Sequence, residues 1–322
     1  MSFKILSLDG GGIRGLISAL ILDEIERRTG QPIASLFDLI AGTSTGGLLA
    51  LGLTKRSPSN PQVPQLSAAD LELLYVEEGN KIFHAPFWHK LFSLGNLVNE
   101  KYPQEGVDLA LEKFLGDAML KDVLTDVVIT SYDIHHRRAW FFRSANAKMD
   151  PMYDFPLVEV GRATSAAPTY FEPQLIEKGG KAFSLVDGGV YANNPAMCAY
   201  ADAINMDVRP DDIVMVSIGT GTSGDQAAMG YKHSDAKDWG LIGWAVPILT
   251  MVMESLSDTV EYQLGRILPP QQYFRLQARL TWANAELDDV SPQNLAALKA
   301  DAQDYVIRAS EYIDQVCETI TK

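Results

Sequence analysis

Residues 37–53 read FDLIAGTSTGGLLALGL, and this stretch decides what fold we expect. An apolar strand, Phe37–Ala41, enters the turn Gly42-Thr43-Ser44-Thr45-Gly46, and a second apolar run leaves it as a helix. Between a strand and a helix, the pattern G-x-S-x-G is typical of a nucleophile elbow. The serine there is strained, so Gly42 and Gly46 must stay small, and the helix dipole faces the site. The pattern therefore predicts Ser44 as a nucleophile, with a plain helix-capping turn as the alternative.

A second glycine-rich turn follows the first predicted strand, Phe3–Leu8, and opens a helix over Arg14–Arg28. Its sequence, Asp9-Gly10-Gly11-Gly12-Ile13-Arg14-Gly15, also matches the dinucleotide-binding pattern G-x-G-x-x-G. That use requires an acidic residue at the carboxyl end of the next strand, whereas Asp38 stands at its beginning. The other use is an oxyanion hole, because consecutive glycines at a helix N-terminus present unhindered N–H groups to a developing negative charge. We favour the oxyanion hole.

Within this hole, Gly11 and Gly12 are the expected donors and Gly10 supports the loop. The N–H of Thr45, next to the nucleophile, is a further candidate donor. Arg14 has three interpretations: it holds the loop, it meets a phosphate, or it is a solvated charge on the helix.

A serine nucleophile needs a proton acceptor. His233 is the only histidine after residue 136, and it stands in a polar, loop-like stretch, which supports a conventional triad poorly. Asp187-Gly188-Gly189 instead ends the predicted strand Ala182–Val186. An aspartate is a weak base with an ordinary pKa of about 3.9, but a dry apolar site raises that value. Asp187 is thus a candidate base, although from this tripeptide alone an ordinary Asp-Gly turn is favoured.

The order of the elements indicates the fold class. Further strands are predicted at Asp126–Ser131, Ala139–Phe142 and Ile213–Ser217, with helices between most strands. Such alternation gives an α/β protein: a mostly parallel sheet with helices on both faces and sites at the carboxyl ends of strands. A last helix is predicted from its cap Ser291 and from Pro292 to the chain end. We expect one domain, 1–322, whose residues 3–221 carry the motifs and whose residues 222–322 are mainly a helical extension.

The composition and net charge limit which kinds of partner the chain can bind. The chain has 322 residues, 47% of them hydrophobic, and a formal net charge of −14. Binding to nucleic-acid phosphates needs clustered Lys and Arg, so we expect no nucleic acid. The same charge disfavours purely electrostatic adhesion to anionic membranes. The five histidines show no metal-ligand spacing, and we expect neither a metal nor a cofactor.

Three features bear on location. Cys198 and Cys317 form no spaced pair and are expected to be thiols in a reducing compartment. The N-terminus has no secretory pattern. The apolar run Trp239–Met253 contains Pro247 and is shorter than the about 20 residues of a spanning helix. We therefore expect a cytoplasmic protein with peripheral membrane contact; the oligomeric state stays open.

Three segments are candidates for lipid contact. Residues 81–92 mix Phe83, Phe87, Trp88, Leu91 and Phe92 with Lys81, His84, His89 and Lys90, as an interfacial patch does, although a core helix end is slightly favoured. The run Trp239–Met253 is plain core by default, with an acyl-chain groove wall or a membrane-docking helix as alternatives. The turn His135-His136-Arg137-Arg138 is a solvated hairpin or a phosphate contact, and we favour the hairpin.

Taken in order, the three turns around Gly11, Ser44 and Asp187 resemble those of the patatin-like phospholipase family. The resemblance extends over residues 3 to 221 and includes three more segments: Thr164-Ser165-Ala166-Ala167-Pro168, Asn193-Asn194-Pro195 and Ser217-Ile218-Gly219-Thr220-Gly221.

The resemblance implies a three-layer α/β/α fold and a Ser–Asp dyad that works without histidine. It implies Ser44 as nucleophile, Asp187 as proton acceptor, and an oxyanion hole at Gly11 and Gly12. Supporting positions are Gly10, Arg14, Gly42, Thr45, Gly46, Gly188 and Gly189. The implied reaction is hydrolysis of fatty acyl esters in glycerolipids without metal or calcium, during transient contact with a membrane or micelle. A transacylase with the same dyad and a noncatalytic lipid-binding or storage protein remain alternatives.

Overall fold

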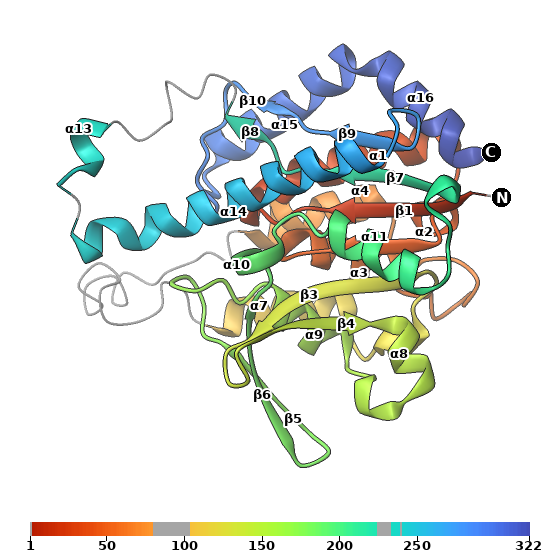
Figure 1. Cartoon of the computed structure of the whole chain (residues 1–322), viewed down its shortest axis with the longest axis horizontal. Coiled ribbons are helices and arrows are strands. Elements are labelled where there is room, and N and C mark those ends of the chain that lie inside the picture. The colour runs from red at the N-terminus through yellow and green to blue at the C-terminus, as the bar shows by residue number, and fades with distance from the viewer. Residues whose placement is uncertain (1, 80–103, 224–232, 239) are drawn as a thin grey trace.

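The computed structural model describes residues 2–79, 104–223, 233–238 and 240–322. At its centre lies an eight-stranded mixed sheet (Figure 1). The strands follow the order β5-β6-β3-β2-β1-β7-β9, and β4 also pairs with β3. Their bounds are β1 Phe3–Leu8, β2 Leu39–Gly42, β3 Asp126–Asp133, β4 Arg138–Arg143, β5 Gln174–Lys178, β6 Lys181–Asp187, β7 Ile213–Ile218 and β9 Tyr273–Leu276. A short pair, β8 (Thr222–Ser223) and β10 (Arg279–Leu280), lies apart from this sheet.

Most neighbours in the sheet are parallel, as predicted. β1 pairs in parallel with β2 and β7, β2 with β3, and β7 with β9. Among the described strands, the antiparallel pairs are β4 with β3, β6 with β3 and β5 with β6. The predicted strands all form, with ends that differ by a few residues. Strand β9 was not predicted, and it shows that the C-terminal third also contributes to the sheet.

Helices cover both faces, which confirms the predicted fold class. The larger helices are α1 Gly15–Thr29, α3 Thr45–Thr54, α7 Gln104–Leu115, α9 Leu157–Thr164, α11 Ala196–Asn205, α14 Leu241–Ile267, α15 Pro292–Arg308 and α16 Ser310–Thr321. Side chains alternate between the faces of β1: Leu6 and Leu8 join the core that includes α1, α3 and α15, whereas Ile5 joins a second core with α11 and α14. Shorter helices are α2 Ile33–Leu36, α4 Ala68–Leu73, α8 Ser144–Met149, α10 Gly189–Ala192 and α13 His233–Ala236.

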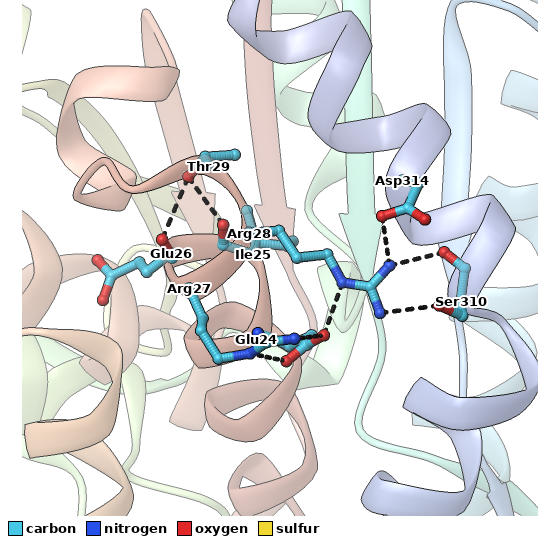
Figure 2. A network of polar contacts seen from close by, with 8 residues as sticks. All are labelled: Glu24, Ile25, Glu26, Arg27, Arg28, Thr29, Ser310 and Asp314. Atoms are coloured by element: carbon cyan, nitrogen blue, oxygen red, sulfur yellow. Dashed lines mark hydrogen bonds and ion pairs between the residues drawn. The ribbon is translucent and has the colours of Figure 1, made fainter.

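The C-terminal helix differs from the prediction of one helix to the chain end. It breaks at Ala309, whose φ of −94° and ψ of 15° leave the helical range, into α15 and α16. The break lets α16 meet the end of α1 (Figure 2). There the guanidinium of Arg28 donates to Ser310 O and to Asp314 Oδ1, both over 2.7 Å. The apolar spacing persists across the break, which is why periodicity alone did not reveal it.

A helix cap and the predicted hairpin turn are two local features of the fold. Ser67 and Asp70 form a capping box at the start of α4, in which Asp70 N–H donates to Ser67 Oγ and Ser67 N–H to Asp70 Oδ2. The turn His135–Arg138 is the exposed β3–β4 hairpin, and His136 Nδ1 lies 2.5 Å from Asp133 Oδ2. Among the described residues, no helix combines the length and apolar character that crossing a membrane requires. The patch at residues 81–92 lies outside the described residues.

Candidate active site

Strand β3 explains how Ser44 and Asp187 come together although β2 and β6 do not pair. Along one edge of β3, Gly42 of β2 pairs with Ile129. Two residues further on, Asp187 of β6 pairs with Ser131. Strand β4 pairs with the other edge of β3 at both Ile129 and Ser131. Strands β2 and β6 therefore lie on the same edge of β3, one after the other. The last residue of β6 consequently lies just beyond the carboxyl end of β2, where the Ser44 turn begins.

The Ser44 turn has the strained geometry expected of a nucleophile elbow. Ser44 has φ 53° and ψ −125°, a left-handed value that non-glycine residues rarely adopt. A Cβ on Gly42 would collide with the backbone of Gly46 and Gly47, which explains the small residues. The Ser44 N–H donates to Thr164 Oγ1 over 2.9 Å and so is not free to bind a substrate oxygen. The side chain of Ser44 is buried at the edge of a cavity.

Asp187 is buried and only partly satisfied. Its Oδ1 accepts the Gly189 N–H over 2.7 Å, whereas Oδ2 has no hydrogen-bond partner among the described residues. Burial raises the pKa of Asp187 to about 6, although the Ser44 hydroxyl and the Gly189 N–H both act to lower it. No Ser44–Asp187 hydrogen bond of normal geometry is formed, yet the hydroxyl is near enough to affect this pKa. Catalytic hydrogen bonds in unliganded sites are often loose in this way.

The glycine loop lies against the nucleophile. A Cβ on Gly10 would lie 3.3 Å from Ser44 Cβ, and Gly12 lines the same cavity as Ser44 and Asp187. The N–H of Gly10 is used, since it donates to Asn193 O over 2.9 Å. Within the described part of the chain, the N–H groups of Gly11 and Gly12 have no partner. They are therefore available as donors, as an oxyanion hole requires.

Gly12 and Gly188 need their lack of a side chain. Gly12 has φ +56°, and a Cβ there would collide with the carbonyl oxygen of Leu287. A Cβ on Gly188 would collide with the side chain of Thr130 in β3. Larger residues at either position would displace one of the three turns.

Arg14 is not a solvated helix charge. It is buried, and its Nη1 donates to Ala285 O over 3.3 Å. Burial lowers the pKa of its guanidinium, with Glu254 and Glu286 acting in the opposite direction. Because Ile13 N–H also donates to Leu287 O over 2.9 Å, this stretch anchors the start of α1 to residues 285–287. The interpretation that Arg14 holds the loop is the one that the contacts favour.

A buried ion pair that sequence reasoning missed anchors the first residue of the loop. Arg275 Nη2 lies 2.6 Å from Asp9 Oδ2, and Arg275 Nη1 donates to Ser217 Oγ over 2.8 Å. The two charged side chains are 8% and 3% exposed. Their separation of 266 residues left no signal in the sequence. Strand β9, which carries Arg275, thus reaches the candidate site from the far end of the chain.

Thr45 bonds to a residue that was also not anticipated. Its Oγ1 lies 2.6 Å from the hydroxyl of Tyr75, in the π-helical turn Leu74–Glu78, and both residues line the cavity. Burial raises the pKa of Tyr75, so its hydroxyl stays protonated. The N–H of Thr45 has no hydrogen-bond partner among the described residues. It stays a candidate donor.

The cavity beside Ser44 is mainly apolar. Apart from residues of the three turns, its walls include Leu48, Leu74, Leu111, Phe171 and Met253. Among its described lining residues none is a histidine, and His233 begins the separate helix α13. An apolar cavity beside a nucleophile suits a hydrocarbon chain.

Helix α14 corrects the default interpretation of the run Trp239–Met253. The helix continues past Pro247 to Ile267. Trp244 and Ile248 are 38% and 51% exposed, so the plain-core interpretation is wrong for them. Met253 is buried and lines the cavity, which supports the groove-wall alternative for that end of the run.

A strained serine between a parallel strand and a helix, facing a glycine loop, defines an α/β protein with a nucleophile elbow. The family model described as patatin-like phospholipase matches residues 6–200, and the chain belongs to this family. Membership supports lipid acyl hydrolase activity in general and implies a lipid substrate. The recognition made from the motifs is thereby confirmed.

Several plant proteins are similar over most of their length. Patatin-like protein 2 of Arabidopsis thaliana is 34% identical over 91% of this chain and 80% of its own length. Patatin-T5 of Solanum tuberosum is 32% identical over 93% of this chain and 82% of its own. Probable inactive patatin-3-Kuras 1 of the same plant is 30% identical, covering 91% and 83%. Relatives with a plain patatin name and one named as probably inactive occur at similar identity. The site of this chain therefore has to be judged by its own geometry.

Among solved structures, VipD from Legionella pneumophila matches 95% of this chain and 67% of its own, with 12% identity and a TM-score of 0.45. This likeness is too weak to bear on function.

Proposed function

We propose that this protein hydrolyses acyl esters of glycerolipids through an acyl-Ser44 intermediate, with Asp187 as the proton acceptor. The observation that carries the proposal is the shared apolar cavity: a strained Ser44 and a buried Asp187 with a free oxygen both line it. A storage or lipid-binding protein would need neither the strained serine nor the desolvated carboxylate, since both cost stability.

In the first step, Asp187 Oδ2 takes the proton of the Ser44 hydroxyl, and Ser44 Oγ attacks the ester carbonyl carbon. The carbonyl oxygen becomes negative and is bound by the N–H groups of Gly11 and Gly12. The tetrahedral intermediate then collapses, the bond to the alcohol oxygen breaks, and Asp187 returns its proton to the leaving alcohol. The acyl chain stays on Ser44 and lies in the apolar cavity.

In the second step, water replaces the alcohol. Asp187 takes one proton from the water while its oxygen attacks the acyl carbonyl, and the same two N–H groups bind the oxyanion. Collapse breaks the acyl–Oγ bond, and the proton on Asp187 passes to Ser44. The Asp187 carboxylate thus acts as the base in both acylation and deacylation. Its raised pKa of about 6 makes it a stronger base than an exposed aspartate. No step requires a metal.

The surroundings of the cavity support contact with a lipid surface. Trp244 and Ile248 project from the same helix that lines the cavity with Met253. A net charge of −14 favours neutral or zwitterionic lipid over anionic lipid. We further propose that residues 1–322 act as one catalytic domain, because Arg275 of β9 holds the first residue of the glycine loop.

The test is fatty-acid release from mixed phospholipid, galactolipid and acylglycerol micelles with calcium chelated. It compares the wild type with Ser44→Ala and Asp187→Asn. Asp38→Asn is the matched control, since Asp38 is an exposed aspartate at the opposite end of β2. We expect the two site variants to lose nearly all release and the control to retain it.

An inert wild type on every lipid, or full activity in Asp187→Asn, would refute the proposal. Product analysis in the presence of an alcohol acceptor separates hydrolysis from transacylation, because the transferred chain then appears as a new ester in place of free fatty acid.

A further inference from the structure

The carbonyl group of Gly10 is held by two side chains that have no role in the reaction proposed above. Thr220 Oγ1 donates to Gly10 O over 3.0 Å, and Asn193 Nδ2 lies 3.4 Å from the same oxygen. The Gly10 N–H donates to Asn193 O over 2.9 Å. Thr220 and Asn193 are both buried, so water does not compete for these bonds. Both polar groups of the Gly10 backbone are therefore fixed.

Fixing the Gly10 carbonyl also fixes the N–H of Gly11. The two groups belong to one planar, trans peptide unit, in which C=O and N–H point in opposite directions. When the carbonyl is drawn toward Thr220 and Asn193, the Gly11 N–H must point away from them. This is the N–H without a partner among the described residues that the proposed mechanism uses as an oxyanion donor.

Packing around Gly11 further restrains the loop. A Cβ on Gly11 would collide with the side chain of Thr220, so this threonine contacts the loop at two successive residues. Asn193 Nδ2 donates in addition to Ser257 Oγ of α14 over 3.1 Å, which holds its side chain in place. Asn193 Oδ1, in contrast, is buried without a partner in the described structure. A buried, unsatisfied oxygen lowers stability, so selection for stability alone does not explain an asparagine here.

We propose that Thr220 and Asn193 are positioning residues of the oxyanion hole: by holding the Gly10 carbonyl they set the direction of the Gly11 N–H. The inference rests on the proposed function. Neither side chain touches the reacting atoms in this scheme. A donor that is already oriented needs no reorganisation when the negative charge develops. The hydrogen bonds of Thr220 and Asn193 to the Gly10 carbonyl therefore act on the transition state rather than on substrate binding.

The experiment measures kcat and KM on a soluble short-chain p-nitrophenyl ester, together with urea unfolding, for Thr220→Val, Thr220→Ser and Asn193→Ala. Valine keeps the shape of threonine and removes the donor, whereas serine keeps the donor. Thr125→Val is the matched control. Thr125 directly precedes β3, away from the site, and its buried hydroxyl donates to Ala34 O.

Removal of a whole oxyanion donor costs on the order of 100- to 1000-fold in rate, so a misdirected donor should cost about 10-fold. We expect Thr220→Val and Asn193→Ala to lower kcat by about this factor with KM nearly unchanged. Thr220→Ser should recover most of the loss. Asn193→Ala should lower kcat without a large loss of stability, because it also removes the unsatisfied oxygen. The control should lower stability and keep kcat.

The inference is overturned if both variants keep kcat within about twofold of an active wild type. It is also overturned if kcat falls in proportion to stability across all four variants, the control included. Asn193→Ala decides the question if Thr220→Val folds poorly. A wild type that is inert, or no more active than Ser44→Ala, would instead refute the proposed function itself.

Discussion

Replacing Asp187 with asparagine should make the protein more stable while it removes activity. The carboxyl is fully buried, and its pKa rises from the ordinary value of an aspartate to about 6. Because the folded state then binds the proton more tightly than the unfolded state, stability falls as the pH rises from about 4 to about 6. The loss is complete above about pH 6, where the buried group is charged. A pKa difference of about two corresponds to about 3 kcal/mol.

Asparagine removes this cost because it is neutral at every pH. Its side-chain oxygen can still accept the Gly189 N–H, and its NH₂ group takes the place of Oδ2, which has no partner in the described structure. Since a buried amide has its own desolvation cost, we expect a gain of about 1 to 3 kcal/mol near neutral pH. Urea unfolding at about pH 7.5 and about pH 4 measures it.

The difference in unfolding free energy between variant and wild type should shrink toward zero at the lower pH, where wild-type Asp187 is itself protonated. Asp38→Asn, at an exposed site, should show no such pH-dependent gain. The reasoning is refuted if Asp187→Asn is no more stable than the wild type near neutral pH, or if its advantage is the same at both pH values.

Two further predictions concern activity and the Asp9 anchor. Since Asp187 must be unprotonated to accept a proton, kcat/KM should fall about tenfold for each pH unit below about pH 6, and a rate that stays constant to about pH 4 would exclude Asp187 as the base. Arg275→Met should lower the free energy of unfolding by about 3 to 5 kcal/mol, because it leaves the Asp9 carboxylate buried without its partner. Urea unfolding checks this, with the exposed Arg209→Met as a control that should change stability little; equal effects of the two would contradict a buried anchor.

The three turns could be predicted because their chemistry is local. The strained Ser44 and the crowded Gly42 and Gly12 leave glycine at fixed spacings, and each turn directly follows an apolar strand. Strand and helix types also followed from local periodicity. The helix break at Ala309 did not, since the residues on both sides keep the apolar spacing of one helix.

What could not be predicted depends on contacts between distant residues. Strand β9 has only four residues, too few for a pattern, and it forms at the edge of the sheet beside β7. Arg275, Thr220 and Asn193 reach the glycine loop from positions about 180 to 270 residues away, as the separations of 266, 210 and 183 residues show. The segments containing Thr164, Asn193 and Thr220 resemble family segments, but only the structure shows that they contact the Ser44 turn and the glycine loop.

The pairing of Asp9 with Arg275 also orders events during protein synthesis. Ribosomes add about 5 to 20 residues each second, so β9 is made roughly 13 to 50 seconds after the glycine loop. Until then the Asp9 carboxylate has no buried cation to meet and keeps its water, and the start of the loop cannot adopt its final, dry environment. The nascent chain therefore carries Ser44 and Asp187 before Arg275 can anchor the glycine loop beside them. On this physical ground, we expect reactivity toward lipid only after β9 has been made.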